Sequence, residues 1–413
     1  MLRAVVCRGS LGARWELVPA DRRAAAVVGG GIAGLAAAVA LAQTGWRVTV
    51  LERAPAFGEV GAGLAVTGNG MTALAALGLD EAVRAVAYET VSLGFQDPSG
   101  RWLIRIPENR PDLRAITTIW GLHRQRLHAV LGQAAEAADD VELVTGAEVV
   151  AVRPGSPGGE PASVTWLTGA GRQTIDADLV VAADGVRSAV RAQLFPAVQP
   201  RYSGSTSWRA VIPDKVSDGQ LVGVWGPGTE FGALRVSASE IYWYGYFRSP
   251  EGAVFADELS EARDHFAAWA PRIRSLVAAT PPERLIRHDV YHLPRGPSAY
   301  VQGRVVLVGD AAHAALPTSG QGAASALEDA VCVGRMIAAP VLAGADLAAA
   351  LIAFDRARRP RCQQIVRTGA RIARLGADVG GGWRQTVRNT LLRLVPVSPF
   401  VKVGSSVVRW QPP

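Results

Sequence analysis

Residues 24–53 read AAAVVGGGIAGLAAAVALAQTGWRVTVLER, and this stretch decides the fold. A short apolar run is followed by a glycine turn, an alanine-rich stretch and a second apolar run at 46–51. That order predicts a strand, a helix and a strand, which together form one βαβ unit. Gly29, Gly31 and Gly34 form a GxGxxG pattern at the turn, and Glu52 closes the second strand twenty-one residues after Gly31.

The spacing of these residues predicts a dinucleotide site. The first glycine permits a tight turn, the second lets the backbone approach a pyrophosphate, and the third lets the helix pack against the strand. The N-terminus of the helix offers N–H groups and partial positive charge to phosphates, and Glu52 can accept hydrogen bonds from a ribose hydroxyl. This unit alone does not distinguish FAD from NAD.

A second glycine-containing segment, RVVLVGDAAHAALPTSGQGAASALEDA at 304–330, narrows the choice of dinucleotide. Gly309 and Asp310 follow a predicted strand, and Gly320 and Gly322 open a predicted helix near Ala323. An aspartate at a strand end can hold a ribityl hydroxyl, and a helix N-terminus facing the flavin N1–C2=O edge stabilises the anion that forms on reduction. Taken alone, the segment is equally compatible with an ordinary strand-to-helix turn.

Three segments resemble the motifs of a known family. GDAAHAALPTSGQG at 309–322 resembles the GD motif of class A flavoprotein monooxygenases, the family of salicylate hydroxylase and 3-hydroxybenzoate 6-hydroxylase. DLVVAADGVRSAVR at 178–191 is similar to that family's DG motif. GLHRQRLHAVL at 121–131 resembles its flavin-contacting arginine segment, from which Gln125 and Arg126 depart. Together with the GxGxxG unit, these motifs follow the family's order over residues 24–340.

The resemblance implies a cofactor and a reaction. The cofactor is FAD, with NADPH or NADH as a transient electron donor. The sequence itself contains no HExxH or CxxC cluster, so no metal is expected. Oxygen adds to the reduced flavin as a C4a-hydroperoxide, and one oxygen atom is transferred to an electron-rich carbon. Pro317 would approach the face where oxygen adds, and His313 would position its loop. The implied FAD contacts are Gly29, Gly31, Ala33, Gly34, Glu52, Arg53, Arg124, Asp184, Arg187, Asp310, Gly320, Gln321, Gly322 and Ala323, of which Asp184 and Arg187 would also support the NAD(P)H encounter.

A segment at 202–295 has the alternating pattern of strands, as in IYWYGYF at 241–247, and predicts a β-rich substrate module. Period-two geometry places Tyr242, Tyr244 and Tyr246 on one face and Trp243 on the other, and only one face can meet a flavin. The candidate substrate contacts are Arg209, Trp225, Trp243, Tyr244 and Tyr246, and His292 is a candidate catalytic base. Burial in an ordinary sheet core and, for Arg209, a structural ion pair are the alternatives.

The predicted fold class is α/β, with a Rossmann-like FAD-binding domain of the glutathione-reductase type, an inserted β-sheet substrate domain and C-terminal helices. Residues 24–90, 115–200 and 296–340 are assigned to the FAD-binding domain, and 91–114 and 201–295 to the substrate domain. Residues 341–413 are assigned to a helical segment. Residues 1–23 are expected to form a poorly ordered extension.

Composition limits the possible partners. The 413 residues are 49% hydrophobic and 19% charged, which predicts a folded globular chain. The net charge of +7 is nearly all arginine, without the basic and aromatic run of a nucleic-acid groove. Three widely spaced cysteines and the absence of a signal-peptide pattern favour a reducing cytoplasm. We expect an aromatic small-molecule substrate and O2 as partners and no stable membrane insertion. The basic and apolar stretch 383–394 is expected to dock on the protein body rather than on a membrane surface.

Other readings stay open at this stage. A halogenase or an isoprenoid reductase shares the GxGxxG fold, but SWRAVIP at 207–213 is not the WxWxIP segment of halogenases. Assignment as an NAD-dependent dehydrogenase would not explain the segments around Asp184 and Asp310. A non-enzymatic flavin-binding redox protein is a further alternative. The sequence does not indicate the oligomeric state.

Overall fold

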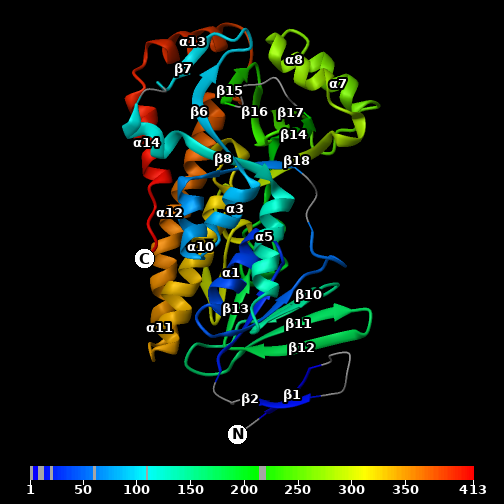
Figure 1. Cartoon of the computed structure of the whole chain (residues 1–413), viewed down its shortest axis with the longest axis vertical. Coiled ribbons are helices and arrows are strands. Elements are labelled where there is room, and N and C mark those ends of the chain that lie inside the picture. The colour runs from blue at the N-terminus through cyan, green and yellow to red at the C-terminus, as the bar shows by residue number, and fades with distance from the viewer. Residues whose placement is uncertain (1–2, 8–13, 19–21, 59–61, 108–109, 214–219) are drawn as a thin grey trace.

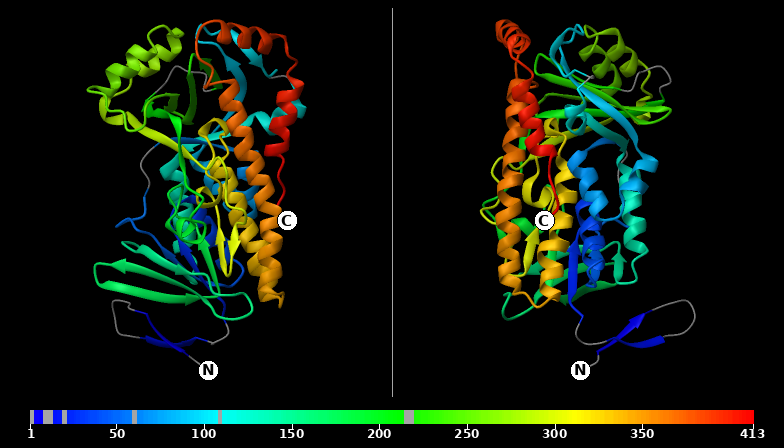
Figure 2. Two further views of the ribbon diagram at one scale, coloured as in Figure 1. Left: turned by 180° about the vertical axis from the view of Figure 1, so that it is seen from behind. Right: turned by 60° about the vertical axis from the view of Figure 1, so that its left-hand side comes forward.

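The computed structural model describes the chain apart from residues 1–2, 8–13, 19–21, 59–61, 108–109 and 214–219. Two large sheets lie toward opposite ends of an elongated molecule, and the long helix α12 (Leu347–Leu375) runs along one side past both of them (Figures 1 and 2). The lower region in Figure 1 contains the βαβ unit, and the upper region contains the aromatic strands. The predicted α/β class is therefore confirmed.

The lower region is built on a six-stranded sheet in which all neighbours are parallel except the β19–β20 pair. Its order is β19 (Val301–Gln302), β20 (Val305–Leu307), β13 (Leu179–Ala182), β3 (Ala24–Val28), β4 (Arg47–Leu51) and β9 (Val141–Val144). Helix α1 (Ile32–Ala42) is buried along almost its whole length, which its alanines and aliphatic side chains allow. The strand, helix and strand of the βαβ unit are confirmed.

A smaller antiparallel sheet borders this region. It consists of β10 (Glu148–Arg153), β11 (Ala162–Thr168) and β12 (Gly171–Ala177). Residues 154–161 connect β10 to β11, as their proline and glycine content predicts.

The upper region is built on a nine-stranded mixed sheet. Its strands are β18 (Ile286–His292), β14 (Arg201–Pro213), β17 (Glu240–Arg248), β16 (Thr229–Ser237), β15 (Leu221–Gly226), β6 (Tyr88–Gln96), β8 (Thr118–His123) and β5 (Gly63–Thr67), with β7 (Trp102–Arg105) paired to β6. Strands β5 and β8 lie outside the predicted segments 91–114 and 201–295. They join this sheet because β8 pairs with both β5 and β6.

The two faces of the upper sheet have different environments. Helices α7 (Glu258–His265) and α8 (Pro271–Ala278) cover the outer face, where they enclose an aromatic core. Trp208, Trp243 and Phe266 are fully buried in this core. The opposite face carries Tyr242, whose ring lies against Gly63 of β5. The inner face of the sheet is therefore the one that meets the rest of the molecule.

The remaining elements are α2 (Gly68–Ala76), α3 (Asp80–Val86), η1 (Pro111–Leu113), α4 (Arg114–Thr117), α5 (Arg124–Glu136), α6 (Ala189–Leu194), η2 (Pro282–Arg284), α9 (Asp310–His313), η3 (Pro317–Ser319), α10 (Gly322–Cys332), η4 (Val333–Ala338), α11 (Ala339–Leu342), α13 (Trp383–Leu394) and α14 (Ser398–Val408). The helical character expected for 341–413 is confirmed. Strands β1 (Arg3–Cys7) and β2 (Arg14–Val18) pair as an antiparallel hairpin, which the sequence analysis did not predict. Among the described residues, no helix is long and apolar enough to cross a membrane.

Candidate active site

The glycine turn after β3 has no room for side chains. Gly29 has a φ of 101°, and a Cβ atom there would lie 2.6 Å from the carbonyl oxygen of Ala183. A Cβ on Gly34 would lie 1.9 Å from the carbonyl oxygen of Gly29. Gly31 is the N-cap residue of α1, and no described side chain caps this helix. The first N–H groups of α1 can therefore bind a pyrophosphate, which is the role predicted for this turn.

Two polar side chains hold the glycine turn in place. One carboxylate oxygen of Glu52 accepts a hydrogen bond from the N–H of Gly30 at 2.7 Å, and the other accepts one from the N–H of Ala54 at 2.8 Å. His128 of α5 is buried and donates its Nε2–H to the carbonyl oxygen of Gly30 at 2.7 Å. The sequence analysis missed His128, because its spacing of four residues from the exposed Arg124 gives no sign of burial. Arg53, next to Glu52, is exposed.

The arginine segment connects the two regions. Arg124 is exposed at the start of α5, directly after β8, and its N–H donates to the carbonyl oxygen of Ala62 at 2.9 Å. His123 and Arg126 both contact the carboxylate of Glu240, at 3.1 and 3.2 Å. Burial raises the pKa of Glu240, but its hydrogen bonds and these two partners outweigh burial and lower it. The residue at 126 that departs from the family pattern thus anchors the segment to the start of β17.

Asp184 follows β13 and has a carboxylate oxygen without a hydrogen-bond partner. Its Oδ2 accepts a hydrogen bond from the N–H of Val190 at 3.1 Å, whereas Oδ1 is buried and has no partner in the described part of the chain. Burial raises the pKa of Asp184 despite its hydrogen bonds to Ser188 and Val190. A buried acceptor without a donor indicates a place that a ligand hydroxyl can fill. Arg187 is exposed and lies over the ring of Tyr291 at 4.7 Å.

The loop after β20 presents backbone and small side chains to solvent. Asp310, Pro317, Gly320 and Gly322 are all exposed, and Gly322 begins α10. Gln321 is different, because its side chain is buried and donates to Thr67 Oγ1 at 3.1 Å. Gln321 can therefore meet a cofactor only through its backbone. Ala323, in the first turn of α10, is half-buried.

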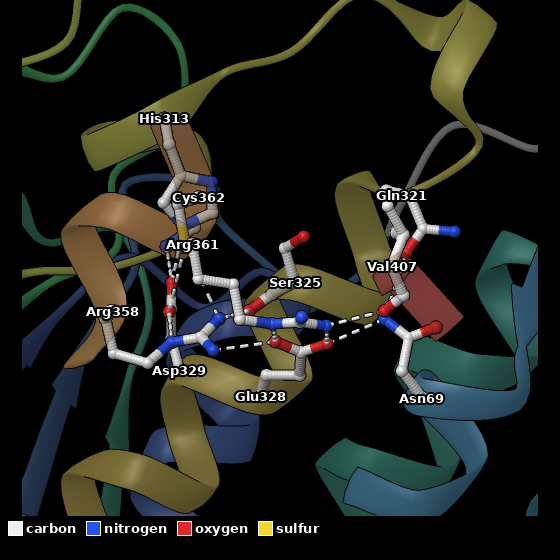
Figure 3. A network of polar contacts seen from close by, with 11 residues as sticks. Asn69, His313, Gln321, Ser325, Glu328, Asp329, Arg358, Arg361, Cys362 and Val407 are labelled. Atoms are coloured by element: carbon white, nitrogen blue, oxygen red, sulfur yellow. Dashed lines mark hydrogen bonds and ion pairs between the residues drawn. The ribbon is translucent and has the colours of Figure 1, made fainter. Parts of the chain in front are cut away.

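A buried ionic network lies behind this loop (Figure 3). Asp329 of α10 accepts hydrogen bonds from Arg358 Nε at 2.7 Å, from the N–H of Gly309 at 2.8 Å and from His313 Nε2 at 2.6 Å. Asp329 and Arg358 are almost completely buried. The side chains of His313, Asp329 and Cys362 lie close enough together to offer metal ligands, but the guanidinium of Arg358 already contacts both Asp329 and Cys362. The arrangement is that of an ion-pair network.

A second half of the network holds the N-terminal end of α10. Glu328 accepts hydrogen bonds from Arg358 at 2.7 Å, from Arg361 at 2.6 and 2.7 Å, and from the side-chain amide of Asn69 at 2.6 Å (Figure 3). Asn69 also contacts Gln321 at 3.0 Å. Helices α2, α10 and α12 are thereby tied together behind the loop that carries Pro317.

His313 is part of this network. Burial by itself lowers the pKa of His313, but Cys362 and Asp329 outweigh burial and raise that pKa well above its usual value. For Asp329 the directions are reversed. Burial alone raises the pKa of this carboxyl, but His313 and Arg358 outweigh burial and bring the pKa below its usual range. His313 is buried and its Nε2 is hydrogen-bonded to Asp329, so this side chain faces the network rather than the solvent-exposed part of the loop. Its position agrees with the expectation that His313 positions the loop.

The inner face of the upper sheet carries an acid that the sequence analysis did not single out. Glu230 of β16 is completely enclosed, and burial raises its pKa to about 7. The indole N–H of Trp225 donates to it at 2.9 Å, and the hydroxyl of Tyr244 donates to it at 3.0 Å. The ring of Tyr244 reaches Glu230 by crossing Gly232, where a Cβ atom would lie 2.5 Å from the ring. Tyr244 is half-buried and belongs to the inner face, on which Arg209 of the neighbouring strand lies opposite it.

Arg209 lies opposite Tyr244 on the neighbouring strand. It is half-buried, and its Nε donates to Ser207 Oγ at 3.3 Å. Arg209 and Arg124 both act on His288, where burial and then these two positive charges lower the pKa of the imidazole. The same two arginines act on Tyr242. The predicted flavin-contacting segment and the upper sheet therefore each contribute a positive charge that acts on His288 and Tyr242.

The other predicted substrate contacts lie elsewhere. Trp243 is fully buried on the outer face, and its indole N–H donates to Thr280 at 2.9 Å. This placement corrects its assignment as a substrate contact, because α7 and α8 cover the face to which Trp243 belongs. Trp225 is 1% exposed beneath Gly376 at the end of α12 and contacts Glu230.

Tyr246 and His292 lie near the Pro317 loop. Tyr246 packs against Leu316 and Val290. His292 is half-buried at the end of β18, and its Nδ1 has no hydrogen-bond partner among the described residues. Burial and then Arg201 lower its pKa, so the imidazole is neutral at pH 7.

The glycine turn, the partnerless carboxylate oxygen of Asp184 and the exposed loop of Asp310 together have the geometry of a dinucleotide-dependent enzyme. The chain belongs to the family described as FAD binding domain, whose model matches residues 22–369. Aurachin C monooxygenase/isomerase from Stigmatella aurantiaca is 36% identical over 375 residues, which cover 89% of this chain and 93% of that protein. The 2-heptyl-3-hydroxy-4(1H)-quinolone synthase from Pseudomonas aeruginosa strain UCBPP-PA14 is 33% identical over 384 residues, 90% of this chain and 94% of that protein.

A solved structure supports the same assignment. The crystal structure of Klebsiella pneumoniae HpxO complexed with FAD and uric acid superimposes with a TM-score of 0.80 and 25% identity, covering 94% of this chain and 96% of that one. The predicted resemblance to class A flavoprotein monooxygenases is confirmed. This protein is an NAD(P)H-dependent FAD monooxygenase that hydroxylates or epoxidises an electron-rich small molecule. An NAD-dependent dehydrogenase, the alternative from another class, does not agree with these relatives.

Proposed function

We propose that this enzyme hydroxylates a nitrogen heteroaromatic of the 4-quinolone type at the carbon next to the ring carbonyl. The substrate C–H, O2, NAD(P)H and one proton would give the C–OH product, water and NAD(P)+. FAD, when bound, supplies the coupling of two electrons from NAD(P)H to the activation of O2. The name of the quinolone synthase from P. aeruginosa supports this substrate class.

The FAD contacts predicted from the sequence form part of this proposal. The N-terminus of α1 and the turn at Gly29 would hold the pyrophosphate, and Glu52 and Asp310 would hold ribose and ribityl hydroxyls. The partnerless Oδ1 of Asp184 supports a ligand hydroxyl at that point. The exposed Pro317 would face the substrate. We further infer a cytoplasmic location, where the buried thiols of Cys332 and Cys362 stay reduced.

The observation that carries the proposal is the contact between Tyr244 and Glu230. Hydroxylation beside the carbonyl requires electron density at that carbon, and removal of the ring N–H proton provides it. Tyr244 would accept this proton while passing its own hydroxyl proton to Glu230 over 3.0 Å. Burial and Glu230 raise the pKa of Tyr244 well above its usual value, so Tyr244 relays a proton and does not store the charge. Glu230, with a pKa of about 7, is suited to receive it.

The positive charge nearby would act on the substrate oxygen. Loss of the N–H proton places negative charge on the carbonyl oxygen of a quinolone. Arg209 and Arg124, which both act on His288, would stabilise that charge. A neutral His288 can add a hydrogen bond without competing for the proton. Tyr242 and Leu234, buried together on this face, would pack against the ring.

A second candidate substrate is an aromatic carboxylic acid. Arg209 favours it, because a guanidinium can bind a carboxylate through two hydrogen bonds. In that case Glu230 would accept the proton of a phenol. The two candidates differ in whether a carboxylate is required for turnover.

A substrate screen tests the proposal. NADH and NADPH oxidation, O2 uptake and peroxide release are followed with a 2-alkyl-4-quinolone, salicylate, urate and an indole. We expect the quinolone to raise the rate and to yield a product one oxygen atom heavier, with little peroxide. Coupled turnover of salicylate alone would favour the second candidate. If no compound raises turnover above the basal oxidase rate, both candidate substrates are wrong.

A further inference from the structure

Helix α13 carries an exposed apolar face at the end of the molecule farthest from the N-terminal hairpin (Figures 1 and 2). Trp383 is 71% exposed, Leu391 is 56% exposed and Leu394 is 75% exposed, and Val387 lies between them. At about 100° per residue, these four side chains fall within an arc of roughly 80° on one side of the helix. Exposed apolar side chains grouped in this way mark an interaction surface.

The opposite side of α13 is anchored to the protein. Arg388 is buried, and it donates hydrogen bonds to the carbonyl oxygens of Leu375 at 3.0 Å and Gly376 at 3.2 Å. Leu392 is buried against Trp225 and Leu103. The expected docking of this helix on the protein body therefore occurs through one side only. On the exposed side, Trp383, Val387 and Leu391 line a shallow hollow together with Leu375 of α12.

Arginine predominates around the apolar face. Residues 379–413 contain no aspartate or glutamate, although Arg393 pairs with Asp97 at 2.6 Å and Arg388 is buried, so Arg384 is the exposed cation of α13 that makes no ion pair in the described part of the chain. Arg384 is exposed and lies over the ring of Trp383 at 5.7 Å. Arg371 and Arg374, near the end of α12, are exposed and have no ion-pair partner in the described part of the chain. A partner for this surface must be both apolar and negatively charged.

We propose that α13 docks on the surface of a bilayer that contains anionic phospholipid. An amphipathic helix with tryptophan and leucine on one side and arginine beside them lies in the plane of the lipid headgroups. The 12 residues of α13 are too few to cross a bilayer, so the contact is peripheral and reversible. Arginine beside the apolar face attracts the anionic headgroups.

A second copy of the chain fits this surface less well. A two-fold dimer through α13 would place this arginine-flanked face against an identical face, which offers no negative charge to Arg384. The exposed face of a helix this short also buries far less than the roughly 1,000 Å² of a stable interface. Charge and area together therefore favour lipid.

Vesicle sedimentation of the FAD-loaded enzyme tests the proposal. We expect sedimentation with vesicles of phosphatidylcholine plus phosphatidylglycerol, little with phosphatidylcholine alone, and a loss of binding as salt is raised. The double variant Leu391→Asp/Leu394→Asp should lower the partition coefficient at least tenfold, and Arg384→Gln should lower it several-fold. Flavin absorbance and the basal NAD(P)H oxidation rate should not change in either variant.

A matched control distinguishes binding through this surface from nonspecific hydrophobic adsorption to vesicles. Ile352 is exposed to 47% on α12, so Ile352→Asp removes an exposed apolar side chain elsewhere and should not affect vesicle binding. Binding that survives Leu391→Asp/Leu394→Asp, or no binding to anionic vesicles, would overturn the proposal. So would sedimentation velocity that shows a dimer in the unmodified enzyme and a monomer in the double variant. None of these outcomes depends on which substrate the enzyme hydroxylates.

Discussion

Buried carboxylates occur in both regions of the molecule, but their partners differ. Glu328 and Asp329 on α10 are surrounded by Arg358, Arg361 and His313. Glu230 on β16 is just as buried, yet both donors that reach it in the described part of the chain, from Trp225 and Tyr244, are neutral.

This difference determines what each carboxylate can do. The carboxylates of the α10 pair are matched by buried cations, which would be left without partners if either carboxylate were removed. In the described part of the chain no cation pairs with Glu230, and burial brings its pKa to about 7. The first group is suited to hold the cofactor loop rigid, and the second is suited to exchange a proton.

The largest expected effect follows from removing a cation of the network. Arg358→Met leaves Glu328 and Asp329 buried with fewer partners, so we expect a loss of about 3–5 kcal/mol in the free energy of unfolding and loss of FAD. Thermal unfolding and the flavin absorbance of the purified variant measure both. Arg359→Met is the control, because the Arg359 side chain is 31% exposed and its partner Asp355 keeps a hydrogen bond from the N–H of Tyr300, so the loss should be smaller, about 1 kcal/mol. An Arg358→Met enzyme that stays stable and retains yellow FAD would contradict the proposed difference between the α10 carboxylates and Glu230.

A second effect is a dependence of stability on pH. The pKa of Glu230 is raised in the folded state, so its stabilising contribution is complete below the unfolded pKa and is lost as pH rises through about 7. A shift of this size corresponds to a change on the order of 3 kcal/mol. Urea unfolding across this range should show a slope that Glu230→Gln removes. An unchanged slope in that variant would mean that Glu230 keeps its charge after all.

A third effect concerns turnover. The rate of hydroxylation should rise with pH through about 7 as Glu230 loses its proton. Glu230→Gln should lower kcat about a hundredfold and abolish this rise. Glu258→Gln is the matched control, because Glu258 also accepts an indole N–H, from Trp208 at 2.7 Å, but at the helix-covered outer face. Equal losses in both variants would show that Glu230 acts through stability alone.

The smallest effect compares neighbours on opposite faces of β17. Tyr244→Phe should lower kcat about tenfold with little change in stability, because only the hydroxyl that reaches Glu230 is lost. Trp243→Phe should leave kcat unchanged and cost about 1 kcal/mol of stability, since its hydrogen bond to Thr280 disappears. Steady-state kinetics measure kcat, and urea unfolding measures the free energy of unfolding, for both variants. A reversed pattern would place the substrate on the outer face.

The cofactor part of the site was predictable because its signals are local. A GxGxxG pattern constrains the backbone within a few residues, and the structure shows why side chains at Gly29 and Gly34 are impossible. The helix that begins at Gly322 was likewise predicted from the glycines before it. His128 was missed because nothing in the sequence shows that its partner is the carbonyl oxygen of Gly30.

The substrate part was less predictable because it depends on strand register. Alternation correctly separated Tyr244 from Trp243, but only the packing of α7 and α8 determines which face is covered. Glu230 meets Trp225 and Tyr244 because β15, β16 and β17 pair in one register and Gly232 leaves space for a ring. No local sequence pattern around Glu230 predicts its contacts with Trp225 and Tyr244.

The central claim is that the protein is a monooxygenase, and labelled oxygen tests it most directly. The FAD-loaded enzyme is supplied with NAD(P)H, a 2-alkyl-4-quinolone and oxygen-18 gas, and the product is analysed by mass spectrometry. We predict one labelled oxygen atom in the product for each NAD(P)H consumed. A product whose new oxygen comes from water, or consumption of NAD(P)H that yields peroxide alone with every substrate in the screen, would contradict the account.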